Sequence, residues 1–275
     1  MPNEDRDAAE IVYQSMLRDG IKLLCCGKDL RVKKTDSGKR LTVDSHGQQY
    51  DITVDEILVG VGRTPNTKGL GLETVGVEYD KAGVKVNDRL QTTNPRIYAA
   101  GDICSRYKFT HAADAMAQIL IQNTLFPHPL GLAYASADAL IMPWCTFTEP
   151  EIAHVGMYEA DAKAKGLEVD TFTFKLDEVD RAILDGEDEG FARAHVKKGT
   201  DQILGATIVA NHAGDMINEF TVLMNAGLGL KTITGTIHPY PTQAEVVKKV
   251  ANAWRKTTFT PRAKQILSKW FAWTR

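Results

Sequence analysis

T-T-N-P-R-I-Y-A-A-G-D, residues 92–102, is the stretch that decides the fold of this 275-residue sequence. Two alanines and a glycine at the end of a predicted strand allow the backbone to approach a ligand closely. Asp102 then begins the next element and can accept hydrogen bonds from sugar-type hydroxyl groups. A helix rich in small residues is predicted just after it, at 111–123. The pattern predicts a ligand-binding strand–turn–helix, and an ordinary strand–turn–helix is the alternative.

The residues before this turn predict one helix and several short strands. Helical spacing of apolar residues predicts an amphipathic helix over 5–19. Short strands joined by tight turns are predicted at 21–27, 29–34 and 40–45. The apolar run D-E-I-L-V-G-V-G-R-T-P-N, residues 55–66, predicts a strand that is buried on both faces.

The character of the sequence changes near residue 135, which predicts a domain boundary. Strands are predicted at 142–147, 170–175, 191–198 and 202–210, and helices at 158–165 and 212–226. Three adjacent strands flanked by helices predict an antiparallel α+β unit.

Composition and charge exclude several classes of protein. Lys and Arg number 33 against 35 Asp and Glu, and they are interspersed, so the chain has no single-sign field that would attract nucleic acid. Its beginning has no secretory signal and no apolar run is long enough to span a bilayer, which predicts a cytoplasmic protein. Four cysteines form no disulphide framework, and no Cys/His spacing predicts a metal site.

Three stretches, in order along the chain, resemble the pyridine nucleotide-disulphide oxidoreductases, the family of dihydrolipoamide dehydrogenase, glutathione reductase and mercuric reductase. V-G-V-G-R-T-P-N, 59–66, is similar to the strand that closes the family's nicotinamide domain. The R-I-Y-A-A-G-D turn, with K-F-T-H-A-A-D-A-M-A after it, resembles the second FAD-contacting segment. W-C-T-F-T-E-P-E-I-A-H-V-G, 144–156, resembles the opening of the dimerisation domain.

The resemblance implies both a fold class and a domain order. The fold class is α/β plus α+β, with a partial FAD/NAD(P)-binding Rossmann-like domain followed by an α+β dimerisation domain. We expect the C-terminal part of the NAD(P)-binding domain at 1–71, the C-terminal part of the FAD-binding domain at 72–135, the dimerisation domain at 136–262 and an amphipathic tail at 263–275.

The resemblance also implies roles for residues in the flavin-contacting segment. Gly101 and Asp102 would lie at the cofactor, with Asp102 at the ribityl chain, and Gly62 would lie near the NAD(P) side of the flavin. The backbone amides of the next segment would approach the isoalloxazine ring, and its residues are Lys108, Phe109, Thr110 and His111.

A departure from the family pattern lies in T-I-H-P-Y-P-T-Q-A-E, 236–245. Thiol-processing members have H-x-H-P-T-x-x-E here, and their second histidine, oriented by the glutamate, is the acid-base catalyst. This chain has His238 at the first histidine, Tyr240 at the second and Glu245 at the glutamate, and the tyrosine resembles mercuric reductase. Tyrosine is a poor base at neutral pH but can donate a hydrogen bond or help to hold a soft metal. His238 as a substituted base is the alternative.

The parts of the family's machinery that precede these motifs do not occur in the sequence. They are the two G-x-G-x-x-G motifs for FAD and the nicotinamide cofactor, and the redox C-x-x-x-x-C. In the intact family, NAD(P)H reduces FAD, which reduces the disulphide and then the substrate. We therefore expect a fragment of such an oxidoreductase that has no reductase activity alone. The start at Met1, just before a helix that the family has inside a domain, favours this over an independent dimerisation module.

Three further expectations concern partners and cysteines. Homodimerisation through the C-terminal domain is predicted by the resemblance. The cationic tail P-R-A-K-Q-I-L-S-K-W-F-A-W-T-R can touch a membrane surface, but docking on its own dimer is the favoured prediction. Cys25 and Cys26 are adjacent on a predicted strand, so one or both thiols are expected to pack as small hydrophobes.

Overall fold

The computed structural model describes residues 1, 3–129 and 132–274, which form two compact units. The first unit comprises Met1–Lys22 and Ile141–Arg275, and the second comprises Leu23–Leu140. Pro2, Leu130, Gly131 and Arg275, which belong to the predicted domains 1–71 and 72–135 and to the predicted tail 263–275, lie outside the described residues. The domain boundaries expected from the resemblance follow family domains rather than compactness, and they stay a prediction.

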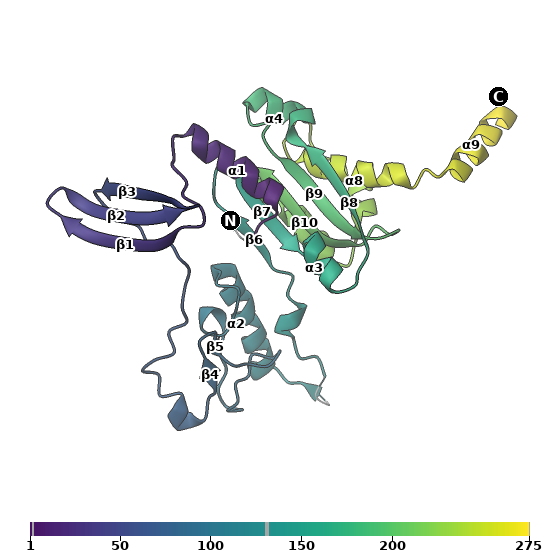
Figure 1. The fold of residues 1–275 in the computed structure, drawn as a ribbon. Helices are drawn as coiled ribbons and strands as arrows, with labels where there is room; N and C mark the ends of the chain where they lie inside the picture. Colours follow the sequence, from purple (N-terminus) through teal and green to yellow (C-terminus); the bar gives the residue numbers. More distant parts are fainter. Residues whose placement is uncertain (2, 130–131, 275) are drawn as a thin grey trace. The chain divides into compact units, whose positions relative to one another are not determined.

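A five-stranded antiparallel sheet forms the centre of the first unit (Figure 1), with the strand order β6-β7-β10-β9-β8. The strands are β6 (Pro143–Thr146), β7 (Glu151–Gly156), β8 (Val169–Lys175), β9 (Phe191–Lys197) and β10 (Ile203–Ala210). All eight residues of β10 are buried. Since successive side chains of a strand point to opposite faces, β10 requires cover on both faces of the sheet.

Helices from the same part of the chain cover one face of the sheet. They are mainly α6 (Asn218–Asn225) and α8 (Glu245–Thr257). In α8 the buried residues Val246, Val247, Val250 and Ala251 recur at helical spacing, so they form one apolar face that packs on the sheet. This is the larger core of the molecule.

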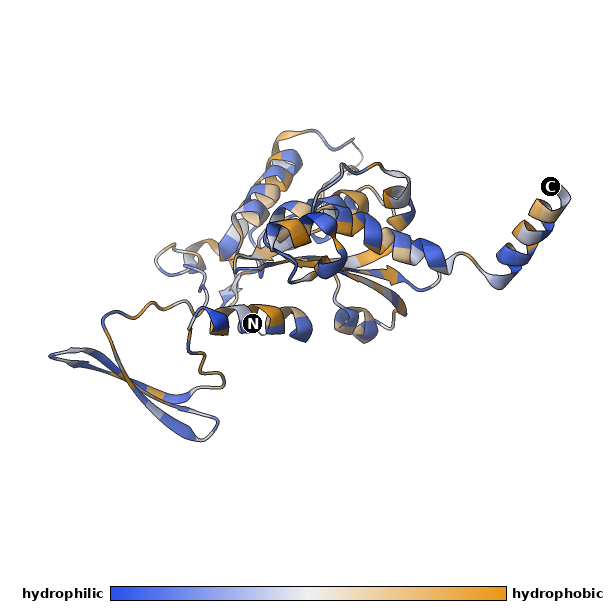
Figure 2. Ribbon diagram, turned by 90° about the horizontal axis from the view of Figure 1, so that it is seen from above, coloured by the Kyte–Doolittle hydropathy of each residue, from blue (hydrophilic) through white to orange (hydrophobic). Residues whose placement is uncertain are grey.

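The opposite face is covered by α1 (Arg6–Arg18), the first helix of the chain. Figure 2 shows α1 on the other side of the sheet from α8. Ala8 and Val12 pack against Ile152, Phe191 and Val209, which come from three neighbouring strands. The helix predicted over 5–19 is therefore confirmed, and its apolar stripe is what the sheet buries.

The rest of the first unit consists of short helices and the tail. They are α3 (Glu159–Ala164), η5 (Leu176–Glu178), α4 (Asp180–Asp185), α5 (Ala213–Met216), α7 (Leu230–Gly235) and α9 (Pro261–Thr274). The helix predicted over 212–226 is divided at Ile217 into α5 and α6. The four strands predicted for this region are all present, whereas β7, α4, α7 and α8 were missed. None of the helices in the described ranges is long and apolar enough to cross a membrane.

The second unit contains two small sheets and one long helix. Its elements are β1 (Lys28–Thr35), β2 (Gly38–Ser45), β3 (Gln48–Val54), η1 (Glu73–Val75), β4 (Tyr79–Asp80), β5 (Gly83–Val84), η2 (Gly101–Ile103), α2 (Thr110–Leu125) and η4 (Ala137–Ala139). The first three strands form an antiparallel meander, and β4 pairs with β5. Leu90, Met116 and Ile119 form the centre of its core. The predicted small-residue helix is α2.

The strands predicted at 55–66 and at R-I-Y-A-A-G-D are wrong. The run 55–66 contains no strand, and its Leu58 and Val61 are 99% and 91% exposed. A doubly buried strand needs neighbouring strands and two covering layers, and no described residue pairs with this run in a sheet. The predicted strand of R-I-Y-A-A-G-D is reduced to one isolated bridge, between Gln91 and Tyr98.

The segment 21–27 is also not a strand, so the expectation for its cysteines is wrong. Cys25 and Cys26 are both exposed, and Cys26 has a φ of 54° in a turn. The hydroxyl of Ser45 donates to the carbonyl oxygen of Cys25 at 2.6 Å, which holds the turn through its backbone. Without the period-two geometry of a strand, neither thiol is directed into a core.

A buried histidine lies on the face of the sheet that α1 covers. His154 is fully buried between the rings of Trp144 and Tyr158, whose centroids lie 4.6 and 3.6 Å from its own. Its Nδ1 lies 2.8 Å from the hydroxyl oxygen of Thr207, its cross-strand partner. Burial lowers the pKa of His154 to about 4. The imidazole is therefore neutral in the folded protein at pH 7.

This burial predicts a loss of stability in mild acid. The folded pKa lies below the unfolded value of 6.5, so the contribution is complete above pH 6.5 and is lost as the pH falls toward 4. Between pH 7 and pH 5 the free energy of unfolding should fall by about 2 kcal/mol from this residue. Urea denaturation of wild type and of His154→Gln at both pH values measures it, and the pH dependence of the variant should be smaller by about this amount.

The exposed His212 in the same unit provides the matched control, His212→Gln, which should keep the wild-type pH dependence. A His154→Gln chain that loses as much stability as wild type between pH 7 and pH 5 would contradict the assignment.

Candidate functional site

Gly101 is the position where the predicted flavin turn demands a glycine. Its φ is 77°, a conformation that side chains disfavour, and a Cβ atom there would lie 2.9 Å from the Cβ of Ala113. The amide of Gly101 donates to the sulfur of Met116 at 3.4 Å. Both neighbours belong to α2, so the glycine allows the turn to pack directly on the helix that follows it.

Arg63 connects the turn at Gly101 and Asp102 to the segment that follows it. Its Nη1 lies 3.2 Å from Oδ2 of Asp102 and donates to the carbonyl oxygen of Lys108 at 2.7 Å. The Lys108 ammonium donates to the carbonyl oxygens of Asp102 and Ser105, at 3.0 and 3.1 Å. Arg63 was not among the predicted site residues, although it directly follows Gly62 in the V-G-V-G-R-T-P-N motif.

The residues at the start of α2 present aromatic rings and a helix N-terminus together. Phe109 precedes the helix in an extended conformation and its side chain makes no capping hydrogen bond. The rings of Tyr107 and Phe109 stack with centroids 6.4 Å apart, and those of Phe109 and His111 stack at 5.2 Å. Thr110 is the first helical residue. A helix N-terminus favours electron-rich groups, so a planar ligand with acceptor atoms suits this segment.

Gly62 differs from Gly101 in its surroundings. Its φ is 103°, but a Cβ atom there would have no other heavy atom within 4 Å. The backbone conformation alone therefore favours glycine at this position, with no close approach by the described residues.

The three residues predicted as catalytic, all in the first unit, have separate partners. Nε2 of His238 lies 2.9 Å from Oε1 of Glu219, and the histidine side chain is almost fully buried. Glu245 begins α8, and its nearest cation is the Lys249 ammonium at 4.0 Å. The hydrogen bond of Tyr240 goes to Asp180, which belongs to neither of the other two pairs. Within one chain, His238 and Tyr240 thus do not share a partner.

Tyr240 is exposed and hydrogen-bonded to an acid. Its hydroxyl donates to Oδ2 of Asp180 at 2.7 Å. This bond raises the pKa of Tyr240, because ionised phenol would lie beside a carboxylate. The side chain is thus a hydrogen-bond donor at neutral pH and a poor base. No sequence signal pairs Tyr240 with Asp180 or His238 with Glu219, because each pair is brought together by the tertiary fold.

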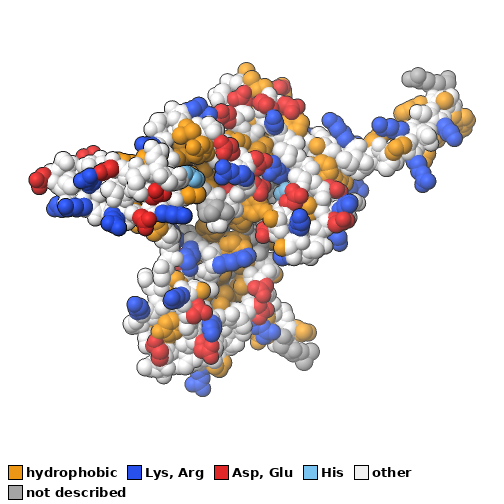
Figure 3. Space-filling view, in the orientation of Figure 1, with side chains coloured by type: hydrophobic (Ala, Val, Ile, Leu, Met, Phe, Trp, Pro, Cys, Tyr) orange, Lys and Arg blue, Asp and Glu red, His pale blue; other side chains and the backbone are white. Residues whose placement is uncertain are grey.

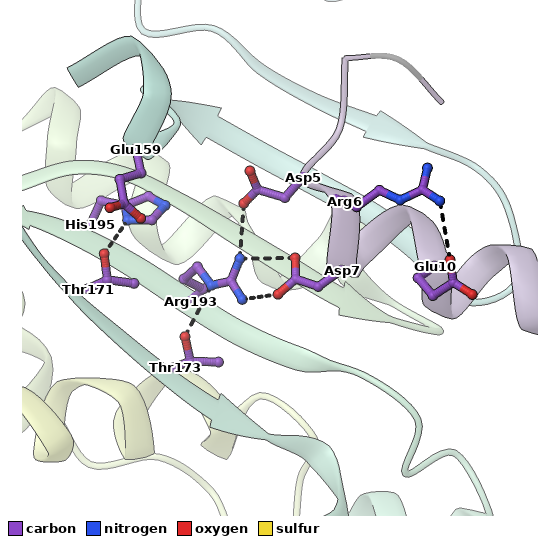
Figure 4. Close-up of a pocket in the computed structure, with 9 residues that line it drawn as sticks. All are labelled: Asp5, Arg6, Asp7, Glu10, Glu159, Thr171, Thr173, Arg193 and His195. Carbon is purple, nitrogen blue, oxygen red and sulfur yellow. Dashed lines mark hydrogen bonds and ion pairs between the residues drawn. The ribbon is translucent and has the colours of Figure 1, made fainter. Parts of the chain in front are cut away.

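A cavity of about 610 Å³ lies between the beginning of α1 and the sheet (Figure 4). It is lined by Asp5, Arg6, Asp7, Glu10, Glu159, Thr171, Thr173, Arg193 and His195. Arg193 bonds both carboxylate oxygens of Asp7 and lies 3.0 Å from the carboxylate of Asp5. The Arg193 hydrogen bond lowers the pKa of Asp7. The charged side chains of Arg193, Asp5 and Asp7 thus bond to one another and hold the start of α1 to β9.

His195 is one of the residues that line this cavity (Figure 4), and it is 2% exposed. Its Nδ1 lies 2.8 Å from the Thr171 hydroxyl oxygen, while Nε2 is buried and has no partner among the described residues. Burial lowers its pKa, so the ring is neutral at pH 7. The described ranges hold no group of three or more His, Cys, Asp or Glu that could bind a metal.

Comparisons with known proteins identify the family of the chain. The sequence profile of the pyridine nucleotide-disulphide oxidoreductases matches residues 1–117, and the profile of their dimerisation domain matches 142–251. This chain belongs to the pyridine nucleotide-disulphide oxidoreductase family. The resemblance inferred from the motifs is confirmed, and so is the fold class of a partial FAD/NAD-binding domain with a dimerisation domain.

Relatives of two kinds are similar along almost the whole chain. A mercuric reductase from Staphylococcus aureus is 36% identical over 92% of this chain and 45% of its own length. A dihydrolipoyl dehydrogenase from Thermus scotoductus is 32% identical over 93% of this chain and 55% of its own length. The chain therefore spans about half the length of the curated relatives it matches.

Solved structures agree with this placement. The HOCl-induced flavoprotein disulfide reductase RclA from Escherichia coli has a TM-score of 0.80 and 26% sequence identity, and the match covers 92% of this chain and 56% of RclA. LpdA from Mycobacterium tuberculosis has a TM-score of 0.80 at 26% identity over 91% of this chain and 53% of its own.

The close approach at Gly101 predicts an unusually costly substitution. Gly101→Ala should destabilise the second unit by about 2–4 kcal/mol, because it adds a steric overlap to the strain of a positive φ. Gly76→Ala is the matched control, since Gly76 has a φ of 71° and a Cβ atom there would meet no other heavy atom within 4 Å. The control should cost only about 1–2 kcal/mol. Urea denaturation of both variants measures the difference, and equal costs would contradict the packing argument.

Proposed function

We propose that this chain is part of an FAD-dependent NAD(P)H oxidoreductase that acts on disulphides or on mercuric ion. It would contribute one flavin-contacting segment and the dimerisation domain. The observation that carries the proposal is the arrangement of residues 101–111. Gly101 packs closely on α2, Arg63 bonds the carboxylate of Asp102, and α2 begins at Thr110. The similarity to mercuric reductase and dihydrolipoyl dehydrogenase supports both substrate classes.

The residues present fit one part of FAD. Asp102 offers ribityl hydroxyl groups a carboxylate, of which Arg63 bonds one oxygen. The segment Lys108–His111 offers backbone amides and the faces of its aromatic rings to the isoalloxazine. When bound, FAD would supply the electron transfer from NAD(P)H to the substrate. The pyrophosphate requires a G-x-G-x-x-G turn, and this sequence contains none.

Tyr240 is proposed as the residue of the 236–245 segment that faces substrate. Its exposed hydroxyl, kept protonated by Asp180, can donate a hydrogen bond or join a thiolate in holding a soft metal ion. His238 and Glu245 would act through this segment, since Glu219 holds His238 at one end of it and Glu245 starts the helix at the other.

The proposal predicts that the chain alone neither retains FAD nor reduces substrate. Without the pyrophosphate turn FAD loses most of its binding surface, and without C-x-x-x-x-C there is no dithiol relay. The measurement is the visible absorbance of the purified chain after incubation with FAD, followed by NADH and NADPH oxidation with a disulphide or Hg²⁺. Stoichiometric bound flavin, or turnover above the free-FAD control, would contradict it.

An independent, non-catalytic dimerisation module is the second candidate. It is supported by the first unit, which has its own core and its own helical cover on both faces of the sheet. The nucleotides upstream of the Met1 codon separate the two candidates. An in-frame stretch that encodes G-x-G-x-x-G and C-x-x-x-x-C would exclude the module.

Homodimerisation is the property that both candidates share. The family's dimerisation domain covers 142–251 of this chain, and within it large apolar side chains are exposed on α6 and just after α7. Val222 and Ile237 are 66% and 92% exposed. Such side chains at the surface of a single chain are typical of an interface.

We therefore expect a particle of twice the chain mass of 30.3 kDa in light scattering. Val222→Asp with Ile237→Asp should shift it to monomer, since two buried charges without partners cost more than about 4 kcal/mol at an interface. Leu30→Asp, on the exposed face of β1, is the control and should leave the mass unchanged. A wild-type monomer, or a double variant that remains dimeric, would contradict the assignment.

A further inference from the structure

The C-terminal helix α9 lies outside both family profiles, which end at residues 117 and 251. None of its described residues is buried, and Ile266, Trp270, Phe271 and Trp273 are all more than half exposed. The chain's own core therefore does not account for the apolar side chains of this helix.

The large apolar residues of α9 lie on one face of the helix. At 100° per residue, Ile266, Leu267, Trp270, Phe271 and Trp273 fall within an arc of about 160°. The rings of Trp270 and Trp273 lie 5.6 Å apart, centroid to centroid, on adjacent turns of this face. Figure 2 shows hydrophobic and hydrophilic segments alternating along α9.

The polar side of α9 carries only positive charge. Arg262 and Lys269 border the apolar arc on one side and Lys264 borders it on the other. Across residues 246–275 the sequence has eight Lys and Arg and no Asp or Glu. Figure 3 shows basic and hydrophobic side chains next to each other on this helix. Lysine and arginine at such borders can extend their charges toward phosphate groups while their stems cover apolar surface.

We propose that α9 binds an anionic lipid bilayer surface, lying in the plane of the interface with its tryptophan face toward the acyl chains. Tryptophan prefers the boundary between headgroups and acyl chains, and basic residues on the polar face are attracted to anionic lipids. A protein surface as partner would have to supply both an apolar groove and acidic residues placed for the flanking cations. A bilayer with anionic lipid supplies an apolar interior and negatively charged headgroups. It supplies them whichever way the helix axis points within the membrane plane.

The test is sedimentation of the full chain with sucrose-loaded vesicles of phosphatidylcholine and about 30% phosphatidylglycerol, against vesicles of phosphatidylcholine alone. The chain should pellet with the anionic vesicles, less with neutral ones, and less as salt is raised. Trp270→Ala with Trp273→Ala should weaken partitioning by about tenfold or more. Lys264→Gln with Lys269→Gln should weaken binding to the anionic vesicles by about fivefold per lysine.

Two controls separate α9 from other exposed surfaces. Trp270→Phe with Trp273→Phe keeps the apolar face, so it should retain binding but lose the blue shift of tryptophan fluorescence that is expected for wild type. Lys33→Gln with Lys34→Gln removes two charges from β1 and should leave partitioning unchanged.

Several outcomes would overturn the proposal. They are equal pelleting of wild type and the tryptophan-to-alanine variant, equal pelleting with neutral and anionic vesicles, and no pelleting at all. A tryptophan-to-alanine variant that changes the mass in light scattering, while wild type ignores vesicles, would place α9 on a second copy of the chain instead.

Discussion

Strand β10, buried along all eight residues, is the constraint on which the first unit depends. A strand at the centre of a five-stranded sheet, apolar on both faces, must be covered twice. One cover comes from α6 and α8, which follow the sheet in sequence. The other comes from α1, at the opposite end of the chain, and Arg193 fastens its first turn through Asp5 and Asp7. The N-terminal residues are therefore part of this core.

Two histidines are buried on the face of the sheet that α1 covers. His154 and His195 are held neutral by burial, and each has a threonine hydroxyl on a neighbouring strand. Burying a polar group is costly unless it is hydrogen-bonded, and these hydroxyls provide one partner for each ring. Protonation of either histidine is thus linked to the integrity of the sheet, because burial in the folded protein favours the neutral ring.

The turn at Gly101, which is the predicted flavin segment, is organised by local contacts of a different kind. Gly101 packs on α2, and Arg63 joins Asp102 to the backbone of Lys108. These contacts lie within the second unit and join only the chain's own residues. Preorganised contacts of this kind reduce the ordering cost of binding. They do not replace the pyrophosphate turn, which carries much of the affinity in dinucleotide sites.

The sequence alone determined the family, the order of its segments and the position of Gly101, because glycine-rich turns and apolar periodicity are local signals. It also located α1, α2 and most strands of the large sheet. The tertiary structure decided the rest. The residues 55–66 do not form the expected strand, because a strand needs neighbouring strands to pair with. Cys25 and Cys26 lie exposed in a turn. The tertiary structure also paired Tyr240 with Asp180 and His238 with Glu219, which are contacts between residues distant in sequence that no local pattern encodes.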